Sequence, residues 1–278
     1  MNILITGING FLGRNLVDSF SNHNLYGFDI DEGKIGDVHV FASSHLADID
    51  MAFDMIIMCH AAVASGVHTP GNDVLYDVNV KLTESILRKF PESSIIFIST
   101  ASIYDSSLDI ISEESKEKPT NNYSISKLWG EHLVISSNRG VALRLSSMFG
   151  KGMKENTLIP TYVMQALETD EINVWGDGMR LQNYIHVTDV AQYIIRIIHN
   201  FNNCEGKVLL GVAPQEHTNT VLAEIIASRC NVPIRSISED HSLSLKYNNK
   251  LTTSLLKYNP TLDFENQLIE YIEWKKNA

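Results

Sequence analysis

Short apolar runs alternate with segments of helical periodicity in the first half of the chain. The pattern predicts strands over residues 3–6, 25–29, 38–41, 55–60, 95–100 and 141–145. Several of these runs are apolar on both faces, as in parallel strands that are covered on both sides. Helices are expected over residues 11–21, 72–90 and 123–137, and the link between the third and fourth strands is too short for a full helix. The alternation predicts an α/β fold with a Rossmann-like, doubly wound parallel sheet.

After Gly150 the alternation becomes irregular. Helices are expected over residues 158–168, 188–201 (with Thr188 as N-cap), 220–229 and 263–275, and a strand over 208–210. We therefore predict two domains, a Rossmann domain over residues 1–150 and a smaller, mixed α/β lid domain over residues 151–278. Whether residues 183–200 pack back on the first domain stays open.

Composition narrows the class of protein. The 278 residues are 44% hydrophobic and 20% charged, with a net charge of −11. That charge argues against nucleic acid as a partner, because phosphate backbones are bound by clustered Lys and Arg. No run approaches the roughly 18 apolar residues of a membrane span, and no leader precedes the first strand, so a cytoplasmic protein without membrane contact is expected. Cys59, Cys204 and Cys230 lack metal-ligand spacing, and no metal is predicted.

A glycine-punctuated turn follows the first strand, with glycines at Gly7, Gly10 and Gly13. Glycines there allow a tight bend and a close approach of a pyrophosphate to the N-terminus of the next helix. Asp29 ends the second strand about twenty residues later, where a carboxylate accepts hydrogen bonds from the adenosine ribose and repels a 2′-phosphate. The Asp29 carboxylate therefore favours NAD as the cofactor, which makes residues 1–150 the expected NAD(P)-binding domain. Arg14 and Lys34 are nearby cations and leave NADP open.

Tyr123 and Lys127 lie one helical turn apart and share a helix face. Lowering a phenol pKa by three units from about 10 needs roughly 4 kcal/mol. An ammonium group about 4 Å away supplies a term of that size at an effective dielectric of about 20. The pair therefore indicates proton exchange with a substrate hydroxyl or ketone while a hydride passes to or from a nicotinamide.

These motifs together resemble the extended short-chain dehydrogenase/reductase family, in its NAD-dependent sugar epimerase/dehydratase branch. The resemblance covers nearly the whole chain. Besides the glycine turn, Asp29 and the Tyr–Lys pair, it is carried by Cys59–Ala62, Asn79 and the segments 99–104, 144–150, 175–178 and 184–189.

The resemblance implies roles for individual residues. Tyr123 is the expected acid/base, Lys127 its electrostatic partner and ribose ligand, and Thr100 the group that hydrogen-bonds the reacting oxygen. The expected cofactor-binding residues are Gly7, Asn9, Gly10, Phe11, Leu12, Gly13, Asp29, Ile30, His60, Ala61, Ala62, Asn79 and Lys127. The expected substrate-binding residues are Thr100, Ser102, Tyr123, Arg180 and Gln182.

Two departures concern the substrate. Dehydratases of the family carry an Asp-Glu pair where this chain has Ala101 and Ser102, which speaks against sugar 4,6-dehydration. Many relatives place an Arg at the position of Gln182 to grip a diphosphate. Either other cations hold the diphosphate, or the substrate is not a typical nucleotide sugar. The candidate cations are Lys151, Lys154, Arg180 and Lys246.

We therefore expect an NAD(P)-dependent oxidoreductase of a sugar or nucleotide sugar, either a 4-keto-sugar reductase or a 4-epimerase. A reductase of a non-nucleotide carbonyl compound and a non-catalytic dinucleotide sensor are the alternatives. The resemblance also implies a homodimer through the helices over 72–90 and 123–137. Their apolar residues fit packing against the sheet equally well, so the oligomeric state stays open; they are Val74, Val78, Leu82, Leu128 and Leu133.

Overall fold

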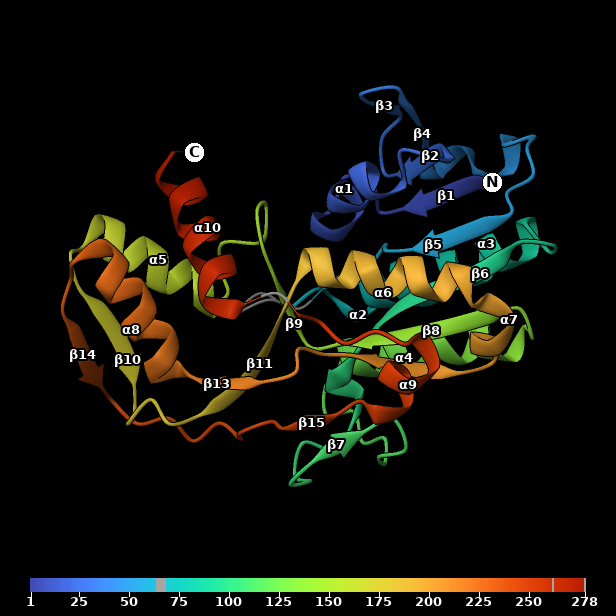
Figure 1. The fold of residues 1–278 in the computed structure, drawn as a ribbon. Coiled ribbons are helices and arrows are strands. Elements are labelled where there is room, and N and C mark those ends of the chain that lie inside the picture. Colours follow the sequence, from blue (N-terminus) through green and yellow to red (C-terminus); the bar gives the residue numbers. More distant parts are fainter. Residues whose placement is uncertain (64–68, 262, 278) are drawn as a thin grey trace.

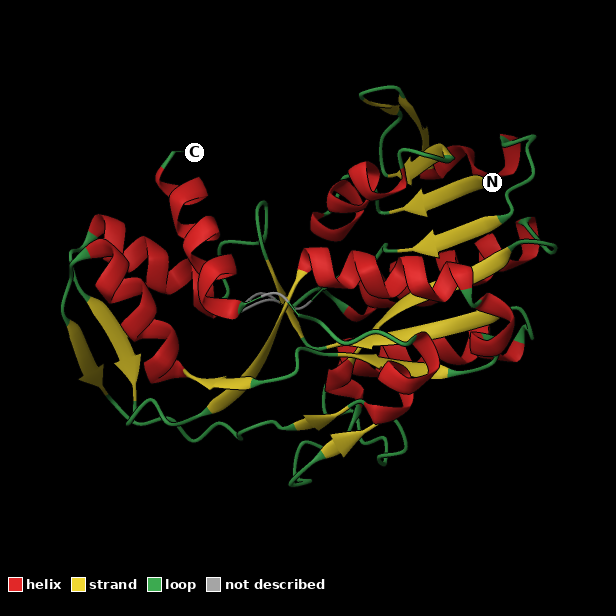
Figure 2. Ribbon diagram, in the orientation of Figure 1, coloured by secondary structure: helices red, strands yellow, loops and turns green. Residues whose placement is uncertain are grey.

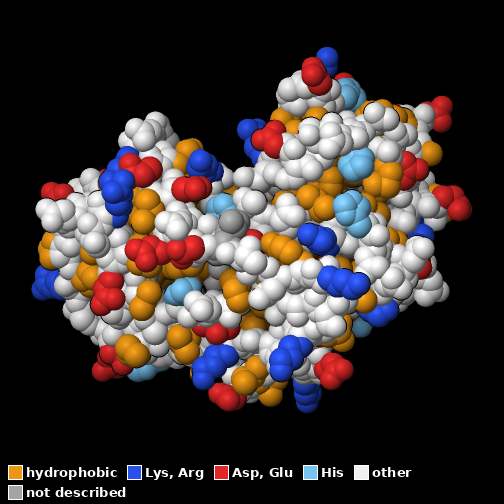
Figure 3. All heavy atoms as spheres, in the orientation of Figure 1, with side chains coloured by type: hydrophobic (Ala, Val, Ile, Leu, Met, Phe, Trp, Pro, Cys, Tyr) orange, Lys and Arg blue, Asp and Glu red, His pale blue; other side chains and the backbone are white. Residues whose placement is uncertain are grey.

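The protein consists of a large lobe built on one sheet and a small lobe at the carboxyl ends of the strands of that sheet (Figure 1 and Figure 3). The computed structural model describes residues 1–63, 69–261 and 263–277. In Figure 1 the large lobe lies on the right, and the small lobe lies on the left around α5, α8 and α10. The chain passes between the two lobes several times, so both are built from segments far apart in the sequence.

The sheet of the large lobe has eight strands in the order β12-β8-β6-β5-β1-β2-β4-β3. All neighbours run parallel except β3 and β4. The strands are β1 (Asn2–Thr6), β2 (Asn24–Asp29), β3 (Gly33–Ile35), β4 (Val38–Ala42), β5 (Met55–Met58), β6 (Ser94–Thr100), β8 (Gly140–Leu145) and β12 (Val208–Gly211). The predicted α/β fold with a doubly wound parallel sheet is confirmed. Strand order reverses between β1 and β5, and this switch point is where such folds bind ligands.

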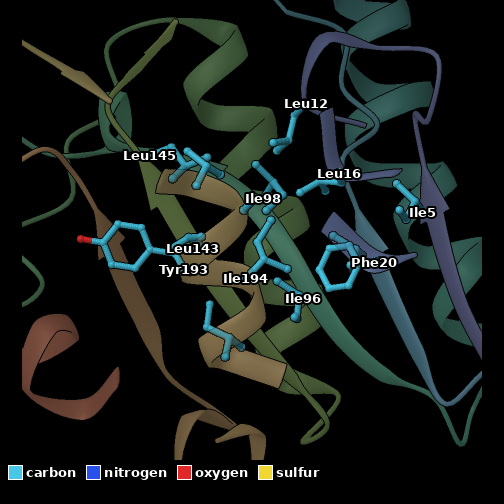
Figure 4. Close-up of a cluster of buried hydrophobic side chains, with 14 of the residues drawn as sticks. Ile5, Leu12, Leu16, Phe20, Ile96, Ile98, Leu143, Leu145, Tyr193 and Ile194 are labelled. Atoms are coloured by element: carbon cyan, nitrogen blue, oxygen red, sulfur yellow. The ribbon is translucent and has the colours of Figure 1, made fainter. Parts of the chain in front are cut away.

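Helices cover both faces of the sheet because its strands are apolar on both faces. Ile3 and Ile5 of β1 point to the face covered by α1 (Phe11–Val17) and α6 (Val187–His199), where Figure 4 shows Leu12, Leu16 and Ile194 packed together. Leu4, between the two isoleucines, points to the opposite face. That face is covered by α3 (Leu82–Lys89) and α4 (Asn122–Ser136). The alternation follows directly from the two-residue period of a strand.

The long helical segment before α3 is not uniform. It begins as α2 (Asn72–Tyr76), passes through a π-helical turn over Asp77–Lys81 and continues as α3. The link between β4 and β5 is the short 3₁₀ segment Ser43–Asp48, in agreement with the expected truncated crossover. A second 3₁₀ turn, Asp18–Phe20, extends α1, and a third, Ala101–Ile103, follows β6.

The small lobe has its own core, centred on Tyr162, Leu222 and Ile272. Its helices are α5 (Leu158–Glu168), α8 (Asn219–Cys230) and α10 (Phe264–Lys276), and β10 (Ile172–Trp175) pairs with β14 (Ile234–Ile237). Figure 2 shows β9 (Ser147–Phe149), β11 (Leu181–His186) and β13 (Glu216–Thr218) forming a separate three-stranded sheet at the junction. The remaining elements lie beside the large sheet and are β7 (Ile111–Ser112), α7 (Phe201–Cys204), β15 (Tyr247–Asn248) and α9 (Lys250–Leu256).

Two local expectations were wrong, and one strand was not predicted. Thr188 is not the N-cap of α6, because the cap is His186, whose Nδ1 accepts a hydrogen bond from the Thr188 backbone N–H at 3.3 Å. The strand expected over residues 55–60 is shorter and ends at Met58. The turn after Asp29 continues into β3, an antiparallel edge strand that no apolar run announced.

Candidate active site

A cavity of about 470 Å³ lies where the two lobes meet, at the carboxyl ends of β1, β5 and β6. The large lobe contributes the glycine turn, Ser99, Tyr123 and Lys127. The small lobe and the junction contribute the other wall, which consists of Ser147, Met148, Met153, Lys154, Thr157, Leu158, Ile159, Gln182 and Tyr184. The expected catalytic pair and the expected cofactor turn therefore open into one space.

The glycine turn is built for close backbone contact. Gly7 has a φ of +66°, and a Cβ on it would lie 2.7 Å from the His60 backbone nitrogen. A Cβ on Gly13 would lie 2.4 Å from the Gly7 carbonyl oxygen, so only glycine lets α1 start this near the strand. Gly10 is the N-cap of α1 and makes no side-chain cap hydrogen bond. The helix N-terminus therefore keeps its positive end available to an anion, and this cradle fits the pyrophosphate of a dinucleotide.

Asp29 lies beside this turn rather than in an unrelated loop. Its carboxylate accepts hydrogen bonds from the backbone N–H groups of Asn9 and Ile30, both at 2.8 Å. The contact with Asn9 ties the end of β2 to the glycine turn, which holds the carboxylate at the rim of the dinucleotide cradle. Arg14 turns back onto Asn9, since its Nε donates to the Asn9 carbonyl at 3.2 Å.

Tyr123 and Lys127 lie in the first turns of α4, and both line the cavity. The Tyr123 phenol hydrogen-bonds the side chain of Thr100 at the end of β6. The Lys127 Nζ lies 4.0 Å from the centre of the Phe97 ring and is almost fully buried. Thr100, Tyr123 and Lys127 are thus brought together, as the resemblance implies.

The electrostatics of the pair differ from the expectation. Burial raises the pKa of Tyr123 to about 12, and the hydrogen bond between the phenol and the Thr100 side chain opposes this rise. Burial also lowers the pKa of Lys127 to about 7, although the carboxylate of Glu131 one turn later favours its charged form. Desolvation is the largest cause of both shifts, and it disfavours the charged form of each group. The side chains alone therefore do not lower the phenol pKa, and an added positive charge beside the phenol is needed to do so.

His60 is engaged with neighbouring threonines. One ring nitrogen lies 2.6 Å from the Thr6 hydroxyl and the other 3.1 Å from the Thr83 hydroxyl. Burial lowers its pKa to about 3, so the ring is neutral. Its expected contact with the cofactor can come only from its backbone, whereas Ala61 lines the cavity directly.

Asn79, at the π-helical turn, braces the chain beside the cavity. Its amide bonds both the N–H of Ala62, at 2.8 Å, and the carbonyl of Ala62, at 3.1 Å. The amide nitrogen also donates to the Ser126 hydroxyl at 2.9 Å. Asn79 therefore fixes the backbone of Ala62, and its direct contact with a cofactor stays a prediction.

The two expected substrate ligands of the small lobe lie at different places. Gln182 lines the main cavity, and its amide nitrogen donates to Asn219 at 2.8 Å. Arg180 lines a neighbouring cavity with Tyr162, Trp175 and Asp240, and Leu158 borders both cavities. Among the described residues that line the main cavity, the cations are Lys127 and Lys154. Lys246 instead lies 3.8 Å from Asp109 on the large lobe.

Some contributors were not singled out from the sequence as ligands. The hydroxyls of Ser99 and Tyr184 are buried without a hydrogen-bond partner among the described residues, and both side chains line the cavity. Such orphaned hydroxyls suit a polar ligand. Ser99 could have been predicted from the sequence, because it precedes Thr100 at the end of a strand. Nothing in the sequence marks Met148 and Met153 as residues of a site. Within the described chain, no cluster of His, Cys, Asp and Glu is arranged to hold a metal ion, and no helix is long and apolar enough to cross a membrane.

The family model described as the NAD dependent epimerase/dehydratase family matches residues 3–211. The chain belongs to this family. The resemblance inferred from the motifs is thereby confirmed, and the family is NAD-dependent, in agreement with the expected cofactor. The matched range ends with β12, the last strand to join the large sheet.

Three relatives illustrate the range of the family. GDP-6-deoxy-D-talose 4-dehydrogenase from Aggregatibacter actinomycetemcomitans is 28% identical over 224 residues, covering 74% of this chain and 75% of its own. The structure of DesIV, a dTDP-glucose 4,6-dehydratase from Streptomyces venezuelae with NAD and TYD bound, has a TM-score of 0.87 at 19% identity, covering 100% of this chain and 98% of that one. UDP-glucuronic acid 4-epimerase from Bacillus cereus in complex with NAD has a TM-score of 0.86 at 18% identity, covering 99% of both chains. These names span a dehydrogenase, a dehydratase and an epimerase, so the fold does not separate the reactions.

Proposed function

We propose that this protein is an NAD-dependent oxidoreductase of a secondary alcohol or ketone on a nucleotide-linked sugar, acting as a 4-keto-sugar reductase or a 4-epimerase. The observation that carries the proposal is that Tyr123, hydrogen-bonded to Thr100, and Lys127 line the same cavity as the glycine turn. NAD, when bound, accepts or supplies the hydride. NADP in its place is the weaker alternative, because Asp29 lies at the rim of the cradle.

In this proposal, separate residues bind the cofactor, exchange the proton and bind the sugar nucleotide. The N-terminus of α1 and Gly7 hold the pyrophosphate, and Asp29 accepts hydrogen bonds from the ribose hydroxyls. Tyr123 exchanges the proton with the sugar oxygen, and Lys127 binds the nicotinamide ribose and adds positive charge beside the phenol. By this division the sheet lobe binds the cofactor and the small lobe the sugar nucleotide, with Gln182 and Arg180 as ligands.

The lining of the cavity favours hydride transfer over elimination of water. Elimination of water needs a base beside the carbon that loses its proton and an acid beside the hydroxyl group that leaves. Among the described residues that line the cavity there is no Asp or Glu, and the positions after Thr100 are Ala101 and Ser102. We therefore place 4,6-dehydration outside the proposed activity.

The first test is Tyr123→Phe. Loss of a positioned general acid/base lowers rates by about 10²- to 10⁴-fold, so kcat should fall by that factor while NAD binding is retained. Tyr26→Phe is the matched control. Tyr26 lies near the start of β2 and does not line the cavity, so this variant should leave kcat unchanged. If both variants keep full activity, the proposed function is wrong, and unchanged ligand binding without any turnover in the wild type would favour a dinucleotide sensor.

The second test separates the two reactions. Purified protein is incubated with a UDP-, GDP- or dTDP-4-keto-6-deoxy sugar and NADH, and separately with the corresponding hexose nucleotides and catalytic NAD. Stoichiometric loss of NADH absorbance identifies a reductase. Interconversion of 4-epimers without net NADH change identifies an epimerase. Turnover of the free keto sugar at the same kcat/KM would indicate a substrate without a nucleotide.

We also propose a homodimer through α2 and α4. Four large apolar side chains on these helices are exposed: Val74, Tyr76, Ile125 and Trp129. The ring centroids of Tyr76 and Trp129 lie 5.7 Å apart, so exposed apolar side chains of the two helices are in contact. Trp129→Glu should convert a dimer to a monomer in light scattering, whereas Trp175→Glu, an exposed tryptophan of the small lobe, should not. A wild-type monomer would contradict the proposal.

A further inference from the structure

A row of hydroxyl groups leads from the catalytic phenol towards the N-terminus of α4. The Thr100 Oγ1, which the Tyr123 phenol contacts, lies 3.0 Å from the Ser102 Oγ. The Ser102 Oγ lies 2.9 Å from the Ser124 Oγ, and the Ser124 Oγ lies 3.1 Å from the Asn121 Oδ1. The row therefore begins in the cavity and ends at the N-cap of the helix that carries Tyr123.

Asn121 gives the row a direction. Its Oδ1 already accepts the Ser124 backbone N–H at 2.9 Å, as the cap of α4, so this oxygen can only accept from the Ser124 hydroxyl. A hydroxyl has one proton. When Ser124 donates to Asn121, it accepts from Ser102, which in turn accepts from Thr100. Thr100 is then left to accept from Tyr123, which holds the phenol in its protonated form.

Passage of a proton reverses this direction. If the Tyr123 proton moves to Thr100, the Thr100 proton moves to Ser102 and the Ser102 proton leaves, every hydroxyl again has one proton. The Ser102 hydroxyl now donates to Thr100, and the Thr100 hydroxyl donates to the phenolate, whereas Ser124 still donates to Asn121. The Ser124 side chain is fully buried, whereas Ser102 is exposed, so Ser102 is where the row meets water.

We propose that Thr100 and Ser102 relay protons between the Tyr123 phenol and water, and that Asn121, acting through Ser124, is a positioning group that holds the relay in the direction of the protonated phenol. The inference rests on the proposed function and extends it. Reduction of a ketone consumes one proton for each hydride, so the phenol must be reprotonated from outside in every turnover. Water gives that proton to Ser102, Ser102 passes its own to Thr100, and Thr100 passes its own to Tyr123.

Other ionisable groups surround the phenol but do not belong to the row. They are Lys127 on the same helix, Cys59 and His60 after β5, Lys154 in the loop before α5, and Tyr184 on β11. All of them are retained in the variants used to test the relay, so their effect on the phenol is the same throughout.

The first measurement is the ionisation of Tyr123 in the NAD-loaded protein, followed by tyrosinate absorbance with Tyr123→Phe as the baseline. In Ser124→Ala, Ser102 loses its acceptor and turns towards Thr100, which then donates to the phenolate. The net contribution of one neutral hydrogen bond corresponds to about 0.4 to 1 pKa unit, so the ionisation should shift downwards by that amount. Ser107→Ala, in an exposed loop where Ser107 bonds Asp105, is the control and should not shift it.

The second measurement tests whether small buffer acids restore turnover when Ser102, the residue that exchanges protons with water, is replaced. Ser102→Ala should slow turnover by about tenfold or more, and small buffer acids should restore the rate in proportion to their concentration. A residue that only supports the fold would not respond to buffer. An unshifted ionisation in Ser124→Ala together with a buffer-independent rate in Ser102→Ala would overturn the relay while leaving the proposed function intact. Full activity of Tyr123→Phe would instead overturn the proposed function itself.

Discussion

Substitution of Arg144 on β8 should destabilise the protein, although this residue lies away from the cavity. Its guanidinium forms ion pairs with Glu131 on α4 and with Glu117, and it lies over the Tyr104 ring at 4.5 Å. The side chains of Arg144 and Glu131 are only 2% and 3% exposed, whereas Glu117 is 37% exposed. Arg144 is therefore the main compensation for a carboxylate inside the large lobe.

The burial of the two partners gives the magnitude. Removing one partner of a buried ion pair leaves an uncompensated charge and costs about 3–5 kcal/mol. Arg144→Met should therefore lower the free energy of unfolding by about that much. Glu117→Gln should lower it by about 1 kcal/mol at most, since the partly exposed pair is screened by water. The double variant Arg144→Met, Glu131→Met should be more stable than Arg144→Met alone, because it removes the unpaired carboxylate as well.

Urea unfolding measures these differences, with midpoints and slopes compared at one pH and salt concentration. Arg88→Met is the control, because its pair with Glu84 lies on the exposed side of α3. The reasoning is refuted if Arg144→Met unfolds within about 1 kcal/mol of the wild type. It is equally refuted if the double variant is no more stable than the single one, since the unpaired charge would then not be the cause.

Three further outcomes are expected. Gly13→Ala should lower stability by about 1–3 kcal/mol and weaken NAD binding in calorimetry, because its Cβ would meet the Gly7 carbonyl, whereas Gly33→Ala has open space and should do neither. Asp29→Asn keeps an acceptor for the turn but removes the charge, so the NADP-to-NAD ratio of kcat/KM should rise at least about tenfold; an unchanged ratio would contradict the role of the carboxylate. Burial holds the pKa of His60 at about 3, below its unfolded value of about 6.5, so the wild type should lose stability as the pH falls from 6.5 towards 3, and His60→Gln should lose less in urea titrations.

Much of the large lobe was predictable because its signals are local. Each strand from β1 to β8 that carries a continuous apolar run was found, since buried parallel strands need no contact information to stand out. The glycine turn and Asp29 were found for the same reason, as both follow a recognisable strand. The pKa of Tyr123 could not be predicted in this way. It rises because the assembled lobes exclude water, and the spacing of residues along the helix carries no information on that burial.

The small lobe was harder to predict, again for a physical reason. Two strands at its junction, β9 and β13, have only three residues each, and they pair with β11, which lies far from both along the chain, so local periodicity does not identify them. The hydroxyl row combines a strand end with a helix cap, Thr100 and Ser102 with Ser124 and Asn121. Each residue alone has an ordinary local explanation, and only the fold brings them into line.

Because β12 comes much later in the sequence than the other strands of the large sheet, the order of synthesis affects how the chain folds. Val208–Gly211 pairs with β8, and α6 buries Val190, Ile194 and Ile197 on the sheet face. During synthesis the sheet thus stays open along β8 until residue 211 has emerged, although its other strands are present by residue 145. A fragment ending at residue 150 would expose this edge and that face, and should aggregate rather than bind NAD. The cofactor site therefore depends on a piece of chain that never touches the cofactor cavity.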